Sequence, residues 1–297
     1  MEHGDREKLR RGSRGRATGV IFGSRQNFAT PAARGAAQWA VMASLLATAR
    51  NWVDHFHVNA GARMEREGRL VWLKRRRWMA GPLMRVANGF FWLAGNPVEA
   101  LVKKHAWRTW EVECFGRLHG PEFQAGCDPA GRPWMEILPG KDLSARLDAR
   151  TLTRDMLAAA AVELRRAHAV DCPYYGGAWS HGDAHSGNFL YDDKSERARI
   201  IDFEVRHRRT LPAEDRHADD VMVLLQDVCG RCRAEDWPGF AAAIVEGYGA
   251  RLITMRLRDR LRVPRAIFPR LWWALRTTWM ARVELERRLE ALRELVG

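Results

Sequence analysis

The pattern of apolar and polar positions changes character several times along the chain. Residues 1–34 are rich in Arg, Gly and Ser and have no apolar period, which is typical of a disordered basic arm. Residues 38–50 then carry apolar side chains at helical spacing. We therefore expect residues 1–50 to form a basic, partly disordered N-terminal arm that contains a short helix.

From residue 51 the pattern indicates short strands and then helices. Three strands are predicted, over residues 53–58, 63–67 and 70–73, with tight turns at Asn59-Ala60-Gly61 and at Gly68. Helical spacing covers residues 83–93 and 105–119, and a further strand over 134–138 stops at Pro139-Gly140. The first part of the chain is therefore rich in strands and ends at a single hinge.

The rest of the chain is mostly helical. Helices are predicted over residues 151–169, 218–228 and 237–252 and in a long final element, and one hairpin interrupts them, with strands over 188–191 and 199–203. Together these elements predict an α+β fold with two lobes. A small lobe with an antiparallel sheet would span residues 51–138, and a larger, mainly helical lobe would span residues 139–297.

Composition narrows the choice of partners without naming one. With 297 residues and 46% hydrophobic content, the chain can bury a substantial core. The formal net charge of +13 favours an anionic partner such as nucleic acid, acidic lipid or a phosphorylated substrate. Arg is far commoner than Lys among the 49 basic residues, a bias that a GC-rich genome also produces. The charge alone therefore does not select among these partners.

The cysteines and the apolar runs bear on the compartment. Cys229 and Cys232 have the spacing of a redox or zinc pair, but no second Cys/His pair at metal-site spacing stands nearby. We interpret the five cysteines as incidental thiols in a reducing compartment. The longest uncharged run, residues 35–49, is short for a spanning helix and lies behind a long basic arm, unlike a signal peptide. We expect a cytoplasmic protein.

One stretch carries candidate chemistry. Between Trp179 and Leu190, His181, Asp183 and Asn188 stand in the order H-x-D-x-x-x-x-N, and Asp202 follows at the end of an apolar strand. Phosphoryl transfer depends mainly on positioning and charge neutralisation. A carboxylate, Asp183, can accept the proton of an attacking hydroxyl. Two hard oxygen ligands, Asn188 and Asp202, can hold magnesium on nucleotide phosphates once the hairpin folds them together.

These residues carry a family resemblance. The run from His181 to Asn188, HGDAHSGN, together with IIDFE ending at Glu204, resembles the aminoglycoside and choline phosphotransferase branch of the protein-kinase-like superfamily. More closely it resembles the lipopolysaccharide kinases that phosphorylate Kdo or heptose in the inner core. The runs of residues 68–77 and 134–143 favour that branch. The resemblance implies ATP and Mg²⁺ as cofactors and a sugar or lipid-linked sugar as acceptor.

The resemblance also implies the nucleotide-binding residues. Lys74 would be the strand lysine that contacts the phosphates. Lys103 and Lys104 are competitors, but they lie too close to the following helix to leave room for strand, turn and helix. The glutamate that pairs with the lysine is Glu111 or Glu113. We favour Glu111, because it lies along the edge of a buried helical stripe.

Further expectations concern the hinge and the departures from the family pattern. Ile137 and Leu138 would form the hinge and offer backbone groups to adenine. No G-x-G-x-x-G stands over the phosphates, and residues 59–61 are expected to supply the only tight turn there. Gly182 replaces the Arg of H-R-D, so no phosphorylated activation loop is expected. Glu204 replaces the Gly of D-F-G, which is consistent with small-molecule kinases.

Two smaller groups of polar residues have simpler interpretations. His181 and His185 are expected to organise the loop through hydrogen bonds, because magnesium prefers oxygen ligands. Asp219 and Asp220 would open a helix at residue 218. One of them could brace the catalytic loop, but charge complementarity with the helix N-terminus explains them equally well.

The C-terminal segment is basic and aromatic. From Arg251 onward it contains 12 Arg against five acids, interleaved with Trp272, Trp273 and Trp279. It is either a helix packed on the larger lobe with a solvated Arg face or a contact with acidic lipid. Nucleic acid is not favoured, because no RNA-binding motif is present. With a lipid contact, the protein would be peripheral on the inner face of the inner membrane.

The sequence thus predicts an ATP-dependent kinase acting on a sugar hydroxyl, most closely in the lipopolysaccharide core. Two alternatives remain open. One is a kinase of a soluble small molecule or of protein Ser/Thr with the same fold. The other is a catalytically weak nucleotide-binding module at a membrane or RNA surface, which the missing Gly-rich loop would favour and the intact catalytic motif opposes.

Overall fold

The structure is a computed structural model that describes residues 59–276 and 280–296 of the chain. All of them lie in the second of two units, Met42–Gly297. The basic arm, the helix predicted over residues 38–50 and the strand predicted over residues 53–58 lie outside the described residues.

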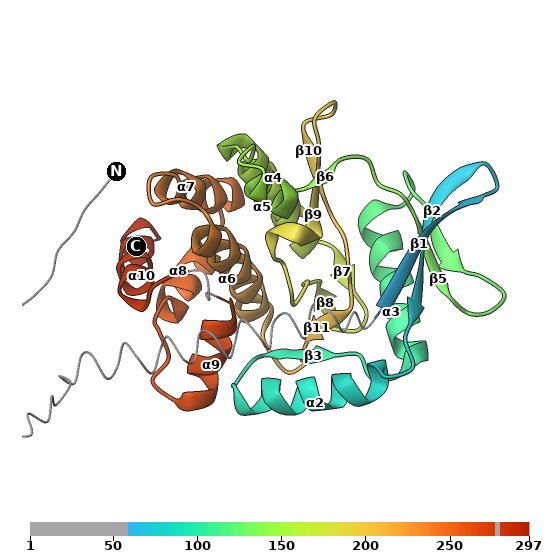
Figure 1. Ribbon diagram of the computed structural model, residues 1–297, viewed down its shortest axis with the longest axis horizontal. Coiled ribbons are helices and arrows are strands. Elements are labelled where there is room, and N and C mark those ends of the chain that lie inside the picture. The colour runs from blue at the N-terminus through green and yellow to red at the C-terminus, as the bar shows by residue number, and fades with distance from the viewer. Residues whose placement is uncertain (1–58, 277–279, 297) are drawn as a thin grey trace, which may run out of the picture. The chain divides into compact units, whose positions relative to one another are not determined.

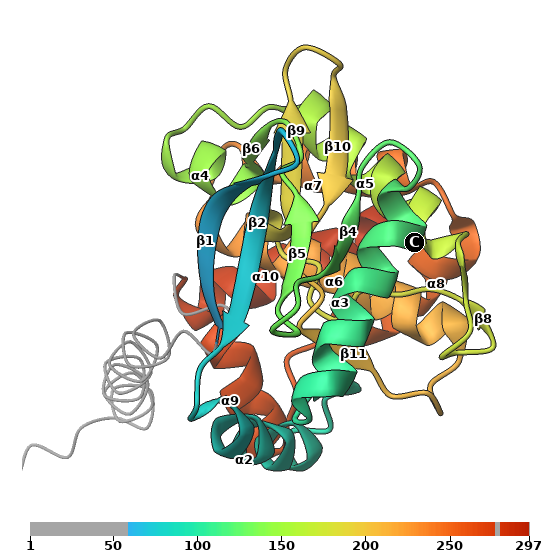
Figure 2. The same cartoon turned by 90° about the vertical axis from the view of Figure 1, so that its right-hand side faces the viewer.

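A four-stranded antiparallel sheet forms the first part of the described chain (Figure 2). Its strands follow the order β1 (Asn59–Arg66), β2 (Arg69–Arg76), β5 (Pro133–Glu136), β4 (Ala125–Cys127). Helix α3 (Lys104–His119) packs against β4 and β5. Its buried stripe includes Trp107, Glu111, Phe115 and Leu118, which follow one another at helical spacing.

The predicted turn at Asn59-Ala60-Gly61 is wrong, because these residues belong to β1. They pair with residues 74–76 of β2, and the hairpin turns at Glu67-Gly68, both with positive φ. A Cβ atom on Gly61 would lie 2.2 Å from the indole of Trp72. The glycine therefore marks a close approach of this side chain rather than a turn.

An additional helix and strand separate β2 from α3. Helix α2 (Ala80–Leu93) contains the predicted helix and is followed by β3 (Val98–Ala100), which pairs with β11 (Val205–His207). The side chain of Asn88 holds α2 to β3, because it donates to the Ala100 carbonyl at 2.9 Å and accepts from the Ala100 N–H at 2.7 Å.

The second part is mainly helical (Figure 1). Its helices are α4 (Leu143–Asp148), α5 (Arg154–His168), α6 (Ala213–Arg231), α7 (Trp237–Tyr248), α8 (Arg251–Arg260), α9 (Ile267–Arg276) and α10 (Arg282–Leu295). The predicted hairpin forms as β9 (Phe189–Asp192) and β10 (Arg197–Ile200), with β6 (Lys141–Asp142) on the outer side of β9. A small hairpin, β7 (Asp171–Cys172) with β8 (Gly177–Ala178), precedes the 3₁₀ turn η1 (Ser186–Asn188).

The core of this part lies where α5 packs on α7 and on the β9–β10 hairpin. Leu157, Leu164, Ile200, Leu224 and Ile244 are fully buried there. Local sequence sets the helix limits. Thr153 caps α5 by accepting from the Met156 N–H, and Gly249 ends α7 in the left-handed conformation.

The C-terminal segment is divided, and the predicted helix over 237–252 ends early, at Tyr248. A single long final element was expected, but the chain forms α8, α9 and α10, and residues 277–279 lie outside the described residues. Leu289, Leu292 and Val296 are buried, so the apolar stripe of α10 packs inward. All five cysteines are free thiols. Among the described residues, every helix is too short or too polar to cross a membrane.

His119 at the end of α3 gives the fold a pH dependence. Its Nε2–H group donates to the Ile200 carbonyl at 2.7 Å, and burial lowers the pKa of His119 to about 4. The folded protein thus keeps this imidazole neutral at a pH where the unfolded chain, with a pKa of about 6.5, takes up a proton. Its contribution is fully present above about pH 6.5 and is lost as the pH falls toward 4.

When the pH falls from 7.5 to 5, the free energy of unfolding of the wild type should decrease. We predict that this decrease is about 2 kcal/mol smaller in His119→Gln. Urea unfolding at the two pH values measures this difference. His105→Gln, an exposed change on the same helix, serves as the control and should keep the wild-type dependence. An unchanged pH dependence in His119→Gln would contradict the assignment.

Candidate active site

A cavity of about 760 Å³ collects the predicted nucleotide-binding residues. Its walls come from the sheet, from α3, from the segment after β5, from the catalytic loop and from the segment after β10. The predicted residues that line it are Lys74, Glu111, Ile137, Leu138, Asn188 and Asp202. Trp72, Met135, Leu190 and Ile201 add apolar surface. The cavity is large enough for a nucleotide and is partly apolar, as small-molecule sites are.

Lys74 is the centre of the charged end of the cavity. It shares one face of β2 with Trp72, while Val71 and Leu73 point to the opposite, buried face. Its Nζ donates to Glu111 Oε1 at 2.7 Å and to Asp202 Oδ1, and it lies 3.8 Å from Glu204 Oε1. Burial alone would lower the pKa of Lys74, but these three carboxylates raise it well above its usual range. The ammonium is therefore charged.

The ion pair between Lys74 and Glu111 decides which lysine and which glutamate meet in the cavity. Glu111 is fully buried and also accepts from the Trp107 indole N–H at 3.1 Å. Glu111, rather than Glu113, is thus the partner of Lys74. Lys103 and Lys104 are exposed where α3 begins.

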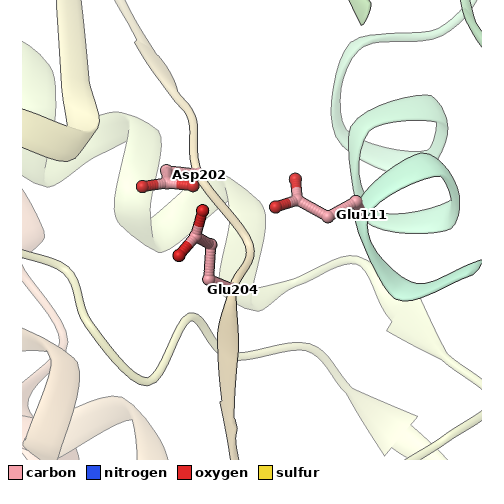
Figure 3. A group of neighbouring side chains, drawn as sticks. All are labelled: Glu111, Asp202 and Glu204. Atoms are coloured by element: carbon pink, nitrogen blue, oxygen red, sulfur yellow. The ribbon is translucent and has the colours of Figure 1, made fainter. Parts of the chain in front are cut away.

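The three carboxylates that contact this lysine lie close to one another, as Figure 3 shows for the carboxylates alone. Glu111 comes from α3, while Asp202 and Glu204 come from the segment after β10, and one oxygen of each lies within 4.8 Å of the others. Burial, and then the charge of Asp202, raises the pKa of Glu204 to about 7. Asp202 has a φ of 68°, an uncommon backbone conformation for a residue other than glycine. Its carboxylate is thereby aimed at Lys74.

The loop of residues 181–188, the predicted catalytic loop, is held in place by Asp220. Its two carboxylate oxygens accept from the backbone N–H groups of His181 and Gly182 at 2.8 and 2.7 Å, and His168 lies 3.0 Å away. Burial alone would raise the pKa of Asp220, but His207, His168 and His181 hold it well below its usual range. The expectation that Asp220 opens a helix is wrong, because α6 begins at Ala213 and buries Asp220 in its second turn.

The loop residues are fixed by their own hydrogen bonds. His181 Nδ1 accepts from the Asp183 N–H at 3.2 Å, so its Nε2–H donates to the Ile201 carbonyl at 3.0 Å. Asn188 donates its amide to the Asp183 carbonyl at 2.8 Å, and its backbone carbonyl accepts from the Ile201 N–H at 2.9 Å. The loop thus brings Asn188 beside the residue that precedes Asp202. As expected, the histidines organise the loop, since His185 Nδ1 accepts from the Gly187 N–H.

Asp183 does not line the cavity itself, but its backbone carbonyl is held by the side chain of Asn188, which does. Its side chain is 43% exposed, and the His185 imidazole lies 3.9 Å from its Oδ2. Ser186, three residues later, is held by the carboxylate of Asp227, to which both its N–H and its hydroxyl donate. A half-exposed carboxylate on a fixed loop can reach a hydroxyl that enters from solvent.

Gly182 has a backbone reason to replace the Arg of the H-R-D pattern. Its φ is 88°, and a Cβ atom would lie 3.1 Å from the backbone of Arg206 in β11. A side chain at this position would therefore strain the loop or displace β11.

Ile137 and Leu138, the expected hinge residues, differ in their backbone hydrogen bonds. The Ile137 N–H donates to the Leu70 carbonyl at 3.0 Å, so it is not available to adenine. Leu138 lines the cavity, and its backbone makes no hydrogen bond with the rest of the described chain. Leu138 is the better candidate for contacting a base.

Sequence reasoning missed the roles of Glu204 and Asp227, and it left Asp220 open between bracing the loop and opening a helix. Glu204 was noted only as a departure from D-F-G, and Asp227 was not considered. Asp220 carried a readable signal, because it stands on the apolar stripe of α6 with Val223 and Leu224 at i+3 and i+4. A charge on a buried stripe requires partners, and here they are the catalytic-loop amides.

Comparisons with known proteins give similarity to solved structures alone. No sequence model of a known protein family matches the chain, and no curated protein matches it. An ADP-bound aminoglycoside phosphotransferase, APH(2'')-Ib, is similar over 83% of this chain and 96% of its own, with 10% identity and a TM-score of 0.39. A MAP kinase from Leishmania major is similar over 81% and 77%, with 16% identity and a TM-score of 0.35.

A third similar structure is a Mycobacterium tuberculosis protein in complex with erythromycin, over 81% and 70%, with 15% identity and a TM-score of 0.35. These scores are too low to carry an argument, so the assignment depends on the geometry. A small antiparallel sheet and a helical part meet at a strand lysine, a helix glutamate and a catalytic loop. This is an α+β, two-lobed, protein-kinase-like fold.

The backbone of the catalytic loop can be tested at Gly182. We predict that Gly182→Ala lowers the free energy of unfolding by about 1 kcal/mol more than Gly176→Ala. Gly176 also has a positive φ, of 65°, but a Cβ atom added there would meet no atom within 4 Å, so this variant isolates the cost of the φ angle. Urea unfolding of both variants measures the difference. Equal losses would mean that the contact with Arg206 is unimportant.

Proposed function

We propose that the protein transfers the γ-phosphate of ATP to a hydroxyl group. The observation that carries this proposal is the meeting of Lys74, Glu111 and Asp202 in a nucleotide-sized cavity that the catalytic loop also lines. Each of the three comes from a different element, so chance proximity of turn residues does not explain the arrangement. A pure binding module would have no need of the half-exposed Asp183 beside it.

The roles follow from position and charge. The Lys74 ammonium would neutralise nucleotide phosphates, and Glu111 would hold it in place. Asp183 would accept the proton of the acceptor hydroxyl as its oxygen bonds to the γ-phosphorus. The bond from that phosphorus to the bridging oxygen of ADP breaks in the same transfer, and ADP leaves with that electron pair.

The donor set fits a magnesium ion. Carboxylates and an amide oxygen are the ligands that Mg²⁺ prefers, and Asp202, Glu204 and Asn188 offer them on the cavity wall. Glu111 Oε2 is buried without a hydrogen-bond partner, so this region can accept further positive charge. Asp202 and Asn188 would hold the ion, with Glu204 nearby. When bound, the metal would neutralise charge on the phosphates.

The acceptor is proposed to be a sugar hydroxyl, and by resemblance one in the lipopolysaccharide inner core, Kdo or heptose. The resemblance of the HGDAHSGN and IIDFE motifs supports this choice, and so does Glu204 in place of the D-F-G glycine. A soluble small molecule or a protein Ser/Thr remains the alternative acceptor.

The metal assignment predicts a thermal shift. Mg²⁺ with ADP should stabilise the wild type by roughly 3 kcal/mol at a hundredfold excess over Kd, and ADP with a chelator should stabilise it much less. Asp202→Asn and Asn188→Ala should abolish the difference. Asp155→Asn, an exposed change in the first turn of α5, is the control. Equal shifts with metal and with chelator would refute the metal site.

The acceptor is tested directly with labelled ATP. Wild type and Asp183→Asn are incubated with lipopolysaccharide core lipids, free sugars and generic protein substrates. We expect label on a core lipid or sugar with the wild type, reduced by at least about a hundredfold in Asp183→Asn. Label on protein alone would select the alternative acceptor, and nucleotide binding without any transfer would favour the weak binding module.

A further inference from the structure

Helix α2 presents apolar side chains to solvent as well as to the interior. Ala80 and Met84 are buried, yet Val86 is 73% exposed and Trp92 is 68% exposed. The exposed positions 82, 85, 86, 89, 92 and 93 follow helical spacing and include a single charged residue, Arg85. A surface helix normally turns polar residues outward, so an apolar outer face indicates a contact that the described chain does not make.

Helix α9 extends this surface. It contacts α2, beside which it lies in Figure 1. The ring of Trp272 packs against Phe91 and Phe90 with centroids 5.2 and 6.1 Å apart. The first residues of α9, Ile267 and Phe268, are exposed. Trp78, which precedes α2, is 89% exposed. The Trp272 ring therefore joins the two helices.

The charged residues near this surface indicate what kind of partner could cover it. The sequence has no Asp or Glu between Glu67 and Glu99, and none between Asp259 and Glu284. Both stretches contain several Arg, so the charged residues that these two stretches contribute beside the apolar face are all basic. Apolar residues with exposed Trp and a basic border match the interface of an anionic bilayer.

We infer that the outer face of α2, with Trp78 and the start of α9, docks on an anionic lipid bilayer. Trp78, Trp92 and Ile267 would lie at the headgroup level, and the surrounding Arg side chains would each add about 1 kcal/mol of attraction to acidic headgroups. A second copy of the chain would carry the same positive border and would repel it. The bilayer is therefore the occupant that the charges favour.

The surface has a fixed relation to the candidate active site. Asn88 holds α2 to β3, and β3 pairs with β11, which begins at the residue after Glu204. Docking would thus hold the cavity at a set orientation to the membrane. The docking itself does not depend on the proposed function. Only its role does, which would be to present a lipid-linked sugar to Asp183.

The test is co-sedimentation of the full chain with vesicles, without nucleotide or acceptor. Vesicles of phosphatidylcholine with phosphatidylglycerol should bind the protein, and phosphatidylcholine alone should not. Binding should weaken with salt as the Debye length falls from about 10 Å at 0.1 M to about 3 Å at 1 M. The double variant Val86→Glu/Trp92→Glu should bind at least about tenfold more weakly. It replaces two apolar side chains, which the bilayer would bury, by charges that acidic lipid repels.

Val162→Glu is the matched control, because Val162 is an exposed valine on α5, outside this surface. It should bind vesicles like the wild type. Wild-type protein that stays in the supernatant, or a double variant that binds normally, overturns the inference. A dimer in sedimentation analysis that Val86→Glu dissociates would assign the face to a second copy instead.

Coverage of the face by the chain's own N-terminal residues has a separate signature. Val86→Glu would then lower the melting temperature well beyond the effect of Val162→Glu, and the wild type would not bind vesicles. Failure of the proposed function is also distinguishable. If no phosphate is transferred to any acceptor, the proposed function fails. The vesicle binding of the double variant and of Val162→Glu still tests the membrane docking, because that assay contains no nucleotide or acceptor.

Discussion

An ammonium group taken out of water stays charged only if carboxylates replace its hydration, and Lys74 meets three of them. They are delivered by separate pieces of chain: Glu111 by α3, and Asp202 and Glu204 by the segment after β10. Burial of several like charges without the lysine would be costly, so the ion network requires the sheet, α3 and the hairpin to take one relative position. The cavity is the space that this arrangement leaves open. In the proposed function, nucleotide phosphates would replace carboxylates as partners of Lys74, and a metal ion would replace Lys74 as the partner of Asp202.

A second network fixes the catalytic loop independently of the first. Asp220 accepts from two consecutive loop amides, and burial lowers the pKa of His168 and of His181 beside it. His181 then joins the loop to the Ile201 carbonyl, one residue before Asp202. The two networks therefore meet at Asp202. A shift of either would move the carboxylate that we propose as a metal ligand away from Asn188.

The motif residues could be predicted from the sequence because the order of polar residues between His181 and Asp202 is specific. The hairpin and most helices could be predicted because their apolar periods are regular. Other features depend on contacts between distant residues. Gly61 was interpreted as a turn residue, because the sequence does not show that the indole of Trp72, on the neighbouring strand, lies against it. The burial of Asp220 depends on loop amides that lie 38 and 39 residues away along the chain. The sequence could not show which apolar residues of α2 point outward, because both faces of the helix carry apolar residues and periodicity alone does not distinguish core from surface.

The central claim is that Lys74 serves the nucleotide rather than the fold alone, and Lys74→Met tests it against Lys103→Met. Removal of the buried ammonium leaves three carboxylates unpaired, so Lys74→Met should also be less stable, by roughly 3–5 kcal/mol. ATP turnover must therefore be measured at a temperature where circular dichroism shows both variants folded. We predict that Lys74→Met loses at least about a hundredfold in turnover while Lys103→Met keeps wild-type activity. A folded Lys74→Met with wild-type turnover, or an inactive Lys103→Met, would contradict it.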